Sequence, residues 1–386
     1  MSSKTETYQS INAPIPDQTW AWNMYGAGVE NIGRNGHPEQ FPVPEPGPDQ
    51  LLVRVDAVGM CFSDVKLIKQ GGSHPKLYNR NLADEPTRLG HEAALTVMKV
   101  GANLRDQYQP GQRLAIQPDI YQQGKSTAYG YTIPGGLTQF HLIGPEVLNA
   151  DQCYVLPLPG KLGYAETALT EPWACVEAAY TQRRRLTPKS GGSMWIVGRP
   201  GDTTAYQFSA GLDAPALIVL TDVPDSLAAH IEETTSAKMV VRNGLTPADY
   251  PALNTELAGG DGFDDIILLD PRSAAAVSEA AKLIAFRGTL NLVGQTPLDG
   301  QPQIDAGRLH YHYTAYVGNP GPDIAASYGE ARNRADLQPG GVALFVGAGG
   351  PMGQMHVQRA IELPNGPRRI IATDVNSMRL AALADR

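Results

Sequence analysis

The chain has 386 residues, more than one hydrophobic core usually holds, so two or three domains are expected. A net charge of −8 argues against nucleic acid as a main partner, and 42% hydrophobic with 18% charged residues is typical of a folded chain. The chain has no apolar run long enough to span a membrane, no signal-peptide core in its opening MSSKTETYQS, and only three widely spaced cysteines (Cys61, Cys153 and Cys175), so a cytoplasmic protein without disulfides is expected.

The first third of the chain is predicted to be rich in β-structure. The segments QLLVRVDAVGM, LGHEAALTVMKVG and PGQRLAIQP are expected strands, and the prolines and glycines between them suit a small barrel or sandwich. In KLGYAETALTEPWACVEAAYTQRRR the apolar residues recur at helical spacing. The arginines at its end, residues 183–185, are expected to be a solvated helix terminus rather than a phosphate site.

The middle of the chain alternates short apolar runs with helical stretches. Strands are predicted near residues 194–198, 216–220, 238–241, 265–269 and 289–293, and SAAAVSEAAKLIAF is expected to be a helix between two of them. Apolar strands that alternate with helices are typical of a parallel sheet in a doubly wound α/β domain.

The last part of the chain resembles the start of the middle part. Gly198, Gly201 and the tripeptide Thr-Asp-Val at 221–223 recur as Gly350, Gly353 and residues 373–375, all at one constant offset. We interpret this as an internal repeat of a nucleotide-binding half. The second copy stops at Arg386, just after its second strand, and such a unit cannot bury its own sheet. The chain is therefore expected to be a fragment, or to have a partner that covers its end.

A cysteine, a histidine and two acids are the candidate metal ligands. Cys61 follows the first predicted strand, His91 and Glu92 lie in RLGHEAAL, and Glu171 lies in TEPWAC. One cysteine, one histidine and one carboxylate can hold a zinc ion and leave a position open for substrate. Each also has a plainer interpretation: a cysteine after a strand is often a small buried hydrophobe, Gly-His-Glu is often a turn, and Glu-Pro often begins a helix. Their ordered combination favours the metal.

The order GMCFSD, GHE, PGQRLAI, GGLTQFHLI and TEP resembles the zinc-dependent medium-chain dehydrogenase/reductase superfamily, from about Trp20 to Gly318. Two longer segments, LAIQPDIYQQGKSTAYGYTIPGGLTQF and RLHYHYTAYVG, are similar to its sorbitol dehydrogenase and sorbose-1-phosphate reductase branch. The resemblance implies a β-rich GroES-like catalytic domain at residues 1–185 and a doubly wound Rossmann-like domain at 186–325, whose glycine turn is degenerate. Residues 338–386 would then begin a second Rossmann-like repeat, which is expected to be truncated.

The resemblance also implies roles for the candidate ligands. Cys61, His91 and either Glu92 or Glu171 would hold one catalytic zinc, and Ser63 would relay the substrate proton; with Ser63, Glu92 is the other predicted catalytic residue. Zinc acts as a Lewis acid that lowers the pKa of an alcohol, and a nicotinamide accepts the hydride. Many relatives carry a second, structural zinc on four cysteines, but residues 117–136 contain no cysteine, so none is expected here.

Two glycine turns are candidates for the cofactor site. A Rossmann fingerprint needs glycines where a strand meets a helix, and an acid about 20 residues later to bind the ribose hydroxyls. Asp222 and Asp374 stand at that spacing, and either acid would favour NAD over NADP because it repels a 2′-phosphate. Position in the chain favours the first copy, and glycine content favours the second. The candidate glycines are Gly198 and Gly201 in the first copy, and Gly347, Gly349, Gly350 and Gly353 in the second.

The sequence therefore predicts a zinc-dependent, NAD-linked oxidoreductase that interconverts a ketone and the secondary alcohol of a polyol, sugar or sugar phosphate. A homo-oligomer with a small-molecule substrate is expected, without nucleic acid or membrane partners. Two alternatives stay open. One is a zinc-free quinone or enone reductase of the same superfamily, and the other is a non-catalytic member that serves as a binding or assembly module.

Overall fold

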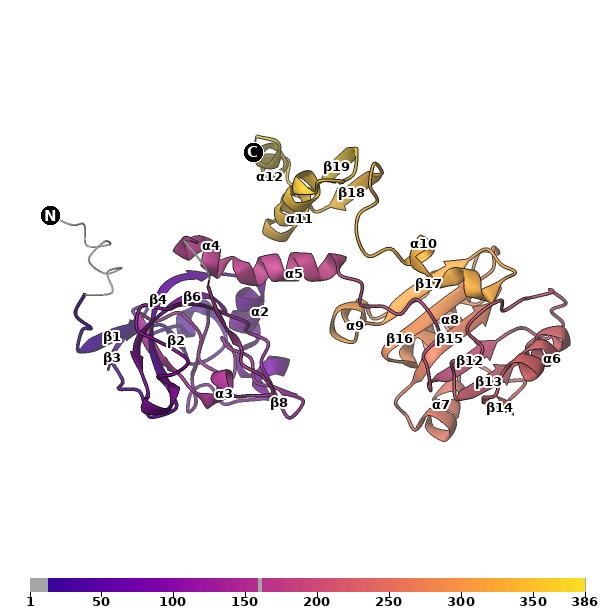
Figure 1. The fold of residues 1–386 in the computed structure, drawn as a ribbon, viewed down its shortest axis with the longest axis horizontal. Coiled ribbons are helices and arrows are strands. Elements are labelled where there is room, and N and C mark those ends of the chain that lie inside the picture. Colours follow the sequence, from indigo (N-terminus) through magenta and orange to yellow (C-terminus); the bar gives the residue numbers. More distant parts are fainter. Residues whose placement is uncertain (1–12, 159–161, 386) are drawn as a thin grey trace. The chain divides into compact units, whose positions relative to one another are not determined.

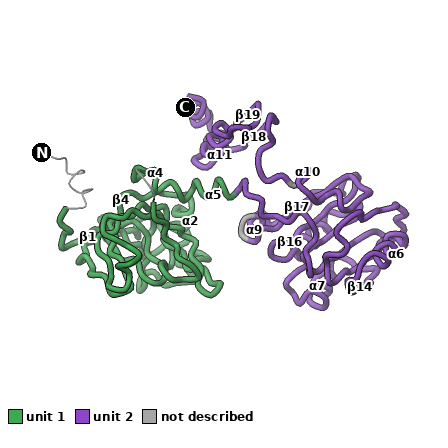
Figure 2. The backbone as a smooth tube through the Cα atoms, viewed as in Figure 1, with its two compact units in different colours: residues 1–178 green, residues 179–386 purple. Residues whose placement is uncertain are grey.

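The computed structural model describes residues 13–158 and 162–385, so the N-terminal stretch for which no signal peptide is predicted lies outside it. The chain forms two compact units, residues 1–178 and 179–386 (Figure 2). No helix in the described ranges is long and apolar enough to cross a bilayer.

Unit 1 is built on a five-stranded antiparallel sheet in the order β10-β4-β6-β7-β11. Figure 1 labels two of its strands, β4 and β6. Its two longest strands, β4 and β6, are buried over most of their length, which is why both read as nearly continuous apolar runs. The strands of unit 1 are β1 (Gln18–Ala21), β2 (Asn23–Met24), β3 (Glu39–Pro42), β4 (Leu51–Gly59), β5 (Thr87–Arg88), β6 (Glu92–Val100), β7 (Arg113–Ile116), β8 (Tyr121–Gln122), β9 (Lys125–Ser126), β10 (Phe140–Ile143) and β11 (Val155–Pro157).

Two apolar clusters of unit 1 flank the candidate metal ligands. The larger one fills the sheet around β4, β6 and β7, and a smaller one joins Met24 of β2 to Leu67 of α2 and to Tyr131. The helices of unit 1, including short 3-10 turns, are η1 (Val29–Asn31), α2 (Phe62–Gln70), η2 (Gly71–Ser73), η3 (Pro75–Leu77), η4 (Ala102–Leu104), α3 (Pro145–Leu148), α4 (Tyr164–Ala168) and α5 (Thr170–Tyr180), the last of which runs into unit 2. Buried Leu67 thus fixes helix α2, which follows strand β4, against the rest of the unit.

Unit 2 contains a six-stranded parallel sheet in the order β14-β13-β12-β15-β16-β17. This confirms the predicted doubly wound sheet. Its strands and helices are β12 (Ser193–Val197), β13 (Leu217–Thr221), α6 (Asp225–Thr234), β14 (Lys238–Val241), α7 (Tyr250–Ala258), β15 (Phe263–Leu269), α8 (Ala274–Lys282), β16 (Ile284–Val293), α9 (Ala306–Tyr311), β17 (Ala315–Asn319), η5 (Ile324–Ser327) and α10 (Glu330–Asn333).

One predicted helix boundary is wrong. The helix expected over SAAAVSEAAKLIAF ends at Lys282, and strand β16 begins two residues later. Ile284 pairs with Phe263 of β15, so the apolar end of that stretch is recruited into the sheet. A short apolar run is compatible with a strand or a buried helix, and periodicity does not distinguish the two.

The first glycine turn is not followed by the helix that a Rossmann fingerprint has at this point. Strands β12 and β13 are parallel neighbours, yet residues 198–216 between them contain no helix. Tyr206, Phe208 and Leu212 of this coil are buried in the core cluster that also contains Ile196 of β12. The segment RPGDTTAYQFSAG has one proline, two glycines and two threonines, all poor helix formers. The coil therefore covers the sheet where a crossover helix normally lies.

The second copy does form its helix. Strand β18 (Val342–Val346) leads through the glycine turn into α11 (Pro351–Glu362), and β19 (Arg369–Thr373) pairs with β18 in parallel before α12 (Ser377–Ala384) (Figure 1).

The expectation for the arginine cluster is wrong in part. Helix α5 ends at Tyr180, before the arginines. Arg185 Nη1 donates to both carboxylate oxygens of Asp265 at 3.2 and 3.0 Å, and Asp265 is almost fully buried. Arg185 is therefore the partner of a core carboxylate, which its neighbours in sequence gave no reason to expect.

Candidate functional site

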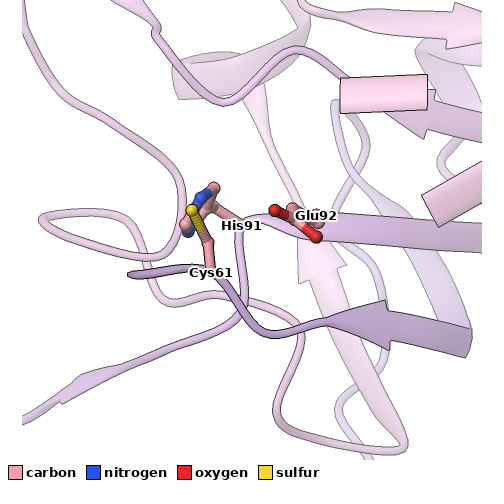
Figure 3. A group of neighbouring side chains, drawn as sticks. All are labelled: Cys61, His91 and Glu92. Carbon is pink, nitrogen blue, oxygen red and sulfur yellow. The ribbon is translucent and has the colours of Figure 1, made fainter. Parts of the chain in front are cut away.

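Cys61, His91 and Glu92 come together in unit 1 (Figure 3). The cysteine sulfur, a histidine ring nitrogen and a carboxylate oxygen all lie within 4.8 Å of one another. His91 and Glu92 are buried and Cys61 is half-buried. Sulfur, imidazole nitrogen and carboxylate oxygen are the donor types that zinc takes in proteins. The three residues thus meet the requirement for a ligand set with an open fourth position.

Helix α2 positions Cys61. Cys61 is the N-cap residue of α2, and Asp64, three residues later, accepts a hydrogen bond from the Cys61 backbone N–H at 2.9 Å. The other oxygen of Asp64 accepts from the N–H of Gly90 at 3.2 Å and lies 3.5 Å from Nδ1 of His91. One buried carboxylate therefore connects the loop that carries Cys61 to the loop that carries His91. A carboxylate behind a ligating histidine orients its ring and increases its basicity.

The electrostatics of this cluster favour a bound cation. Burial alone would lower the pKa of His91, but Asp64, Cys61 and the Glu171 carboxylate raise it to about 10. In turn, the hydrogen bond with His91 lowers the pKa of the Cys61 thiol, although burial opposes this change. In the described part of the chain, Nδ1 of His91 is buried without a well-formed hydrogen bond. A site that stabilises positive charge and contains an acidified thiol fits a divalent metal.

Glycine at position 59 makes room for the third ligand. Gly59 ends β4 and pairs with Glu92 at the start of β6. A Cβ atom at residue 59 would lie 2.0 Å from Oε2 of Glu92, so a larger residue would displace the carboxylate. Burial raises the pKa of Glu92, while His91 opposes that rise. Glu92 is held where it can ligate.

Glu171 lies outside the group of three. It stands in the first turn of α5, where a carboxylate interacts favourably with the helix dipole. The thiol of Cys175 lies 3.8 Å from its Oε1, one helical turn away. Burial raises the pKa of Glu171, whereas the charge of His91 lowers it, so the acid is near enough to act on the cluster. The geometry favours Glu92 over Glu171 as the third ligand.

Sequence reasoning missed the residues that surround Ser63. The Ser63 hydroxyl lies 3.6 Å from the Cys61 sulfur and also interacts with the Tyr131 hydroxyl. The Tyr131 ring centroid is 5.8 Å from that of His91. Nothing in the sequence near Tyr131 marked this contact. The role of Asp64 had a signal, because an acid three residues after an N-cap is typical of a capping box.

The sequence profile of the family "Alcohol dehydrogenase GroES-like domain" matches residues 47–177, the segment that carries all of these side chains. This match confirms, for the GroES-like segment, the resemblance to the alcohol dehydrogenase-like, medium-chain dehydrogenase/reductase superfamily. It is 28% identical over 320 residues to the L-sorbose 1-phosphate reductase of Klebsiella pneumoniae, covering 78% of this chain and 75% of that one. It is also 28% identical over 278 residues to the sorbitol dehydrogenase of Gallus gallus, with 67% and 72% covered.

Among solved structures, a protein of Sinorhizobium meliloti 1021 described as a zinc-binding dehydrogenase, bound to NADP, aligns with 94% of this chain and 100% of its own. The sequence identity is 19% and the TM-score is 0.36.

The two glycine turns of unit 2 differ in geometry. In the second copy, Gly350 is the N-cap of α11, and a Cβ on Gly353 would lie 2.3 Å from the carbonyl oxygen of Gly347. Asp374, just after β19, accepts from the backbone N–H of Gly349 at 2.9 Å. Glycine is therefore required for this close approach of helix and strand, as in a dinucleotide fingerprint.

In the first copy, Gly201 has a positive φ of 75° but begins no helix. Both carboxylate oxygens of Asp222 accept from the N–H of Gly244, at 3.0 and 3.2 Å. Gly198 still allows a close approach, since its Cβ would lie 2.3 Å from the Asp222 carbonyl oxygen. The first copy thus keeps the strand contact of the fingerprint without the helix.

Proposed function

We propose that this protein is a zinc-dependent oxidoreductase that interconverts a secondary alcohol and a ketone with NAD(H), the alcohol being a polyol, a sugar or a sugar phosphate. The observation that carries the proposal is the group Cys61, His91 and Glu92, whose ligand atoms lie within 4.8 Å of one another in the GroES-like unit. The relatedness to a sorbose 1-phosphate reductase and a sorbitol dehydrogenase supports the substrate class.

The residues of unit 1 have three proposed roles: metal binding, orientation of a ligand and proton relay. Cys61, His91 and Glu92 would hold the zinc, which supplies Lewis acidity toward an alcohol or carbonyl oxygen when bound. Asp64 keeps the His91 ring oriented through its position beside Nδ1. Ser63, whose hydroxyl lies 3.6 Å from the Cys61 sulfur, would relay the proton of the substrate hydroxyl by accepting it while passing its own proton on.

The cofactor is assigned to the second glycine turn, residues 347–353. Its helix N-terminus suits a pyrophosphate, and Asp374 stands where the ribose hydroxyls of NAD bind. A carboxylate at this position repels the 2′-phosphate of NADP. The expectations of a homo-oligomer and of a cytoplasmic location stay predictions.

Metal content and turnover test the proposal together. The purified chain should contain about one zinc per molecule. Cys61→Ser should lose most of it, while Cys153→Ser, at an exposed cysteine of the same unit, should retain it. NAD-linked oxidation of a panel of polyols, sugars and sugar phosphates should follow the zinc content. A zinc-free protein that reduces enones or quinones with a nicotinamide cofactor would support the alternative reductase instead.

A further inference from the structure

Side chains of unit 2 meet at the carboxyl ends of β12 and β15. In the order β14-β13-β12-β15-β16-β17 the chain runs outward in both directions from this pair, which makes it the topological switch point. Open parallel sheets bind their ligands in the crevice at such a point. Arg199 follows β12, and Asp270 follows β15.

An ion pair bridges the switch point. Nη2 of Arg199 lies 3.4 Å from Oδ2 of Asp270 and 3.4 Å from Oδ2 of Asp202. Arg272 also donates to Asp270, and Thr296 donates its backbone N–H and its hydroxyl to the same carboxylate at 3.3 and 3.4 Å. The Asp270 carboxylate thus accepts from donors that follow three neighbouring strands, β12, β15 and β16.

The Asp270 carboxylate is held as an anion. Burial on its own raises the pKa of Asp270, but the hydrogen bonds from Thr296 and Arg272 outweigh that effect and lower it. Backbone geometry fits the same role. Asp270 has a left-handed φ of 40°, and a Cβ on Gly294 would lie 2.7 Å from the Cα of Asp270, so the two loops meet closely. Two guanidinium groups and a backbone N–H around one anion resemble a pyrophosphate site whose anion is supplied by the protein.

We infer that the first Rossmann-like copy holds no dinucleotide, and that Asp270 replaces the cofactor's phosphate as an internal anion that ties the strand ends together. Two independent features agree: the coil in place of the fingerprint helix, and the ion pair across the switch point. The inference rests on one part of the proposed function, namely that NAD binds at the glycine turn of the second copy.

Removing the internal anion tests this directly. In Asp270→Ala the two guanidinium groups of Arg199 and Arg272 lose their shared carboxylate, and the buried Nε of Arg199 already has no hydrogen-bond partner among the described residues. The full-length chain is unfolded thermally with inorganic phosphate, against chloride at equal ionic strength. Asp270→Ala should melt about 2–6 °C below wild type. Phosphate should raise the midpoint of this variant by more than that of wild type, in which only the second glycine turn is expected to bind the anion.

Two further variants make the test decisive. Asp261→Ala, at an exposed acid of the same unit, should behave as wild type with and without phosphate. Asp270→Asn keeps the shape of the side chain and should show a smaller fall in midpoint. Equal phosphate effects in wild type and Asp270→Ala would refute the internal anion. Absence of zinc or turnover would overturn the proposed function but leave this result unaffected.

NAD binding tests the other half of the inference. Isothermal titration of the full-length chain should show the same NAD affinity in wild type and Arg199→Ala, with a loss in Asp374→Asn. A loss of NAD binding in Arg199→Ala with normal binding in Asp374→Asn would place the cofactor in the first copy and overturn the inference.

Discussion

Substitution of Gly59 by alanine should displace the proposed zinc ligand Glu92 although Glu92 itself is unchanged. Gly59 and Glu92 are cross-strand neighbours, and the added methyl group would lie 2.0 Å from Oε2 and 3.0 Å from Cδ of Glu92. Ordinary contacts of this kind begin near 3.4 Å, so the carboxylate must move by more than an ångström. Metal–ligand distances tolerate only about 0.2 Å. The displaced carboxylate can therefore no longer ligate in its present position.

Substitution of a residue that only hydrogen-bonds to a metal ligand typically lowers metal affinity about 10- to 100-fold. Gly59→Ala should weaken zinc binding by at least this much, or about 1.4–2.7 kcal/mol. Zinc affinity is measured by competition with a chromogenic chelator on metal-depleted full-length chain. Gly47→Ala is the matched control, because the nearest atom to its new Cβ is the flexible end of Gln50 at 3.2 Å. Both glycines lie outside the left-handed region, so neither alanine is strained by its backbone.

Unchanged zinc affinity in a folded Gly59→Ala protein would refute the assignment of Glu92 as a ligand. Glu171→Gln then decides between the two acids, because it should weaken zinc binding only if Glu171 is the third ligand. If Glu92 is the ligand, Glu171→Gln should leave the metal content near one per chain.

Three other predictions concern stability and the cofactor. Burial lowers the pKa of His141 to about 3, so the unfolded chain alone takes up this proton as the pH falls below about 6.5. The free energy of unfolding that this neutral histidine contributes above about pH 6.5 should therefore fall by up to about 2 kcal/mol at pH 5. Urea unfolding of His141→Gln should show a weaker dependence on pH, and an unchanged dependence would contradict the lowered pKa of His141. Gly353→Ala places a Cβ 2.3 Å from the Gly347 carbonyl oxygen, so it should lower the free energy of unfolding by about 1–3 kcal/mol and abolish NAD binding. A normal NAD affinity in calorimetry would show that this turn is not the dinucleotide site. Arg185→Ala leaves the buried Asp265 carboxylate uncompensated and should cost about 3 kcal/mol in urea unfolding, whereas a cost below about 1 kcal/mol would show that its other donors suffice.

Local pattern in the sequence was enough to predict the framework. Five of the six parallel strands of the large sheet in unit 2, β12 to β16, were predicted because each is a short apolar run between turn residues, and β14 was placed at its observed bounds, residues 238–241. Cys61, His91 and Glu92 were recognised as candidate ligands because their ordered combination resembles a zinc-dependent superfamily, although each motif alone has a plainer interpretation. These inferences need only the order of residues along the chain.

Other features depended on which distant residues meet, and only the tertiary structure decided them. The proximity of Glu92 to Cys61 and His91 accompanies the pairing of β4 with β6, which places a glycine opposite Glu92. The missing helix after β12 follows from the burial of the connecting coil in the core, and the Arg199–Asp270 pair from the adjacency of β12 and β15. Strand order and register set these contacts. Both are properties of the whole sheet, because each strand is held by partners far away in sequence, and no short segment contains that information.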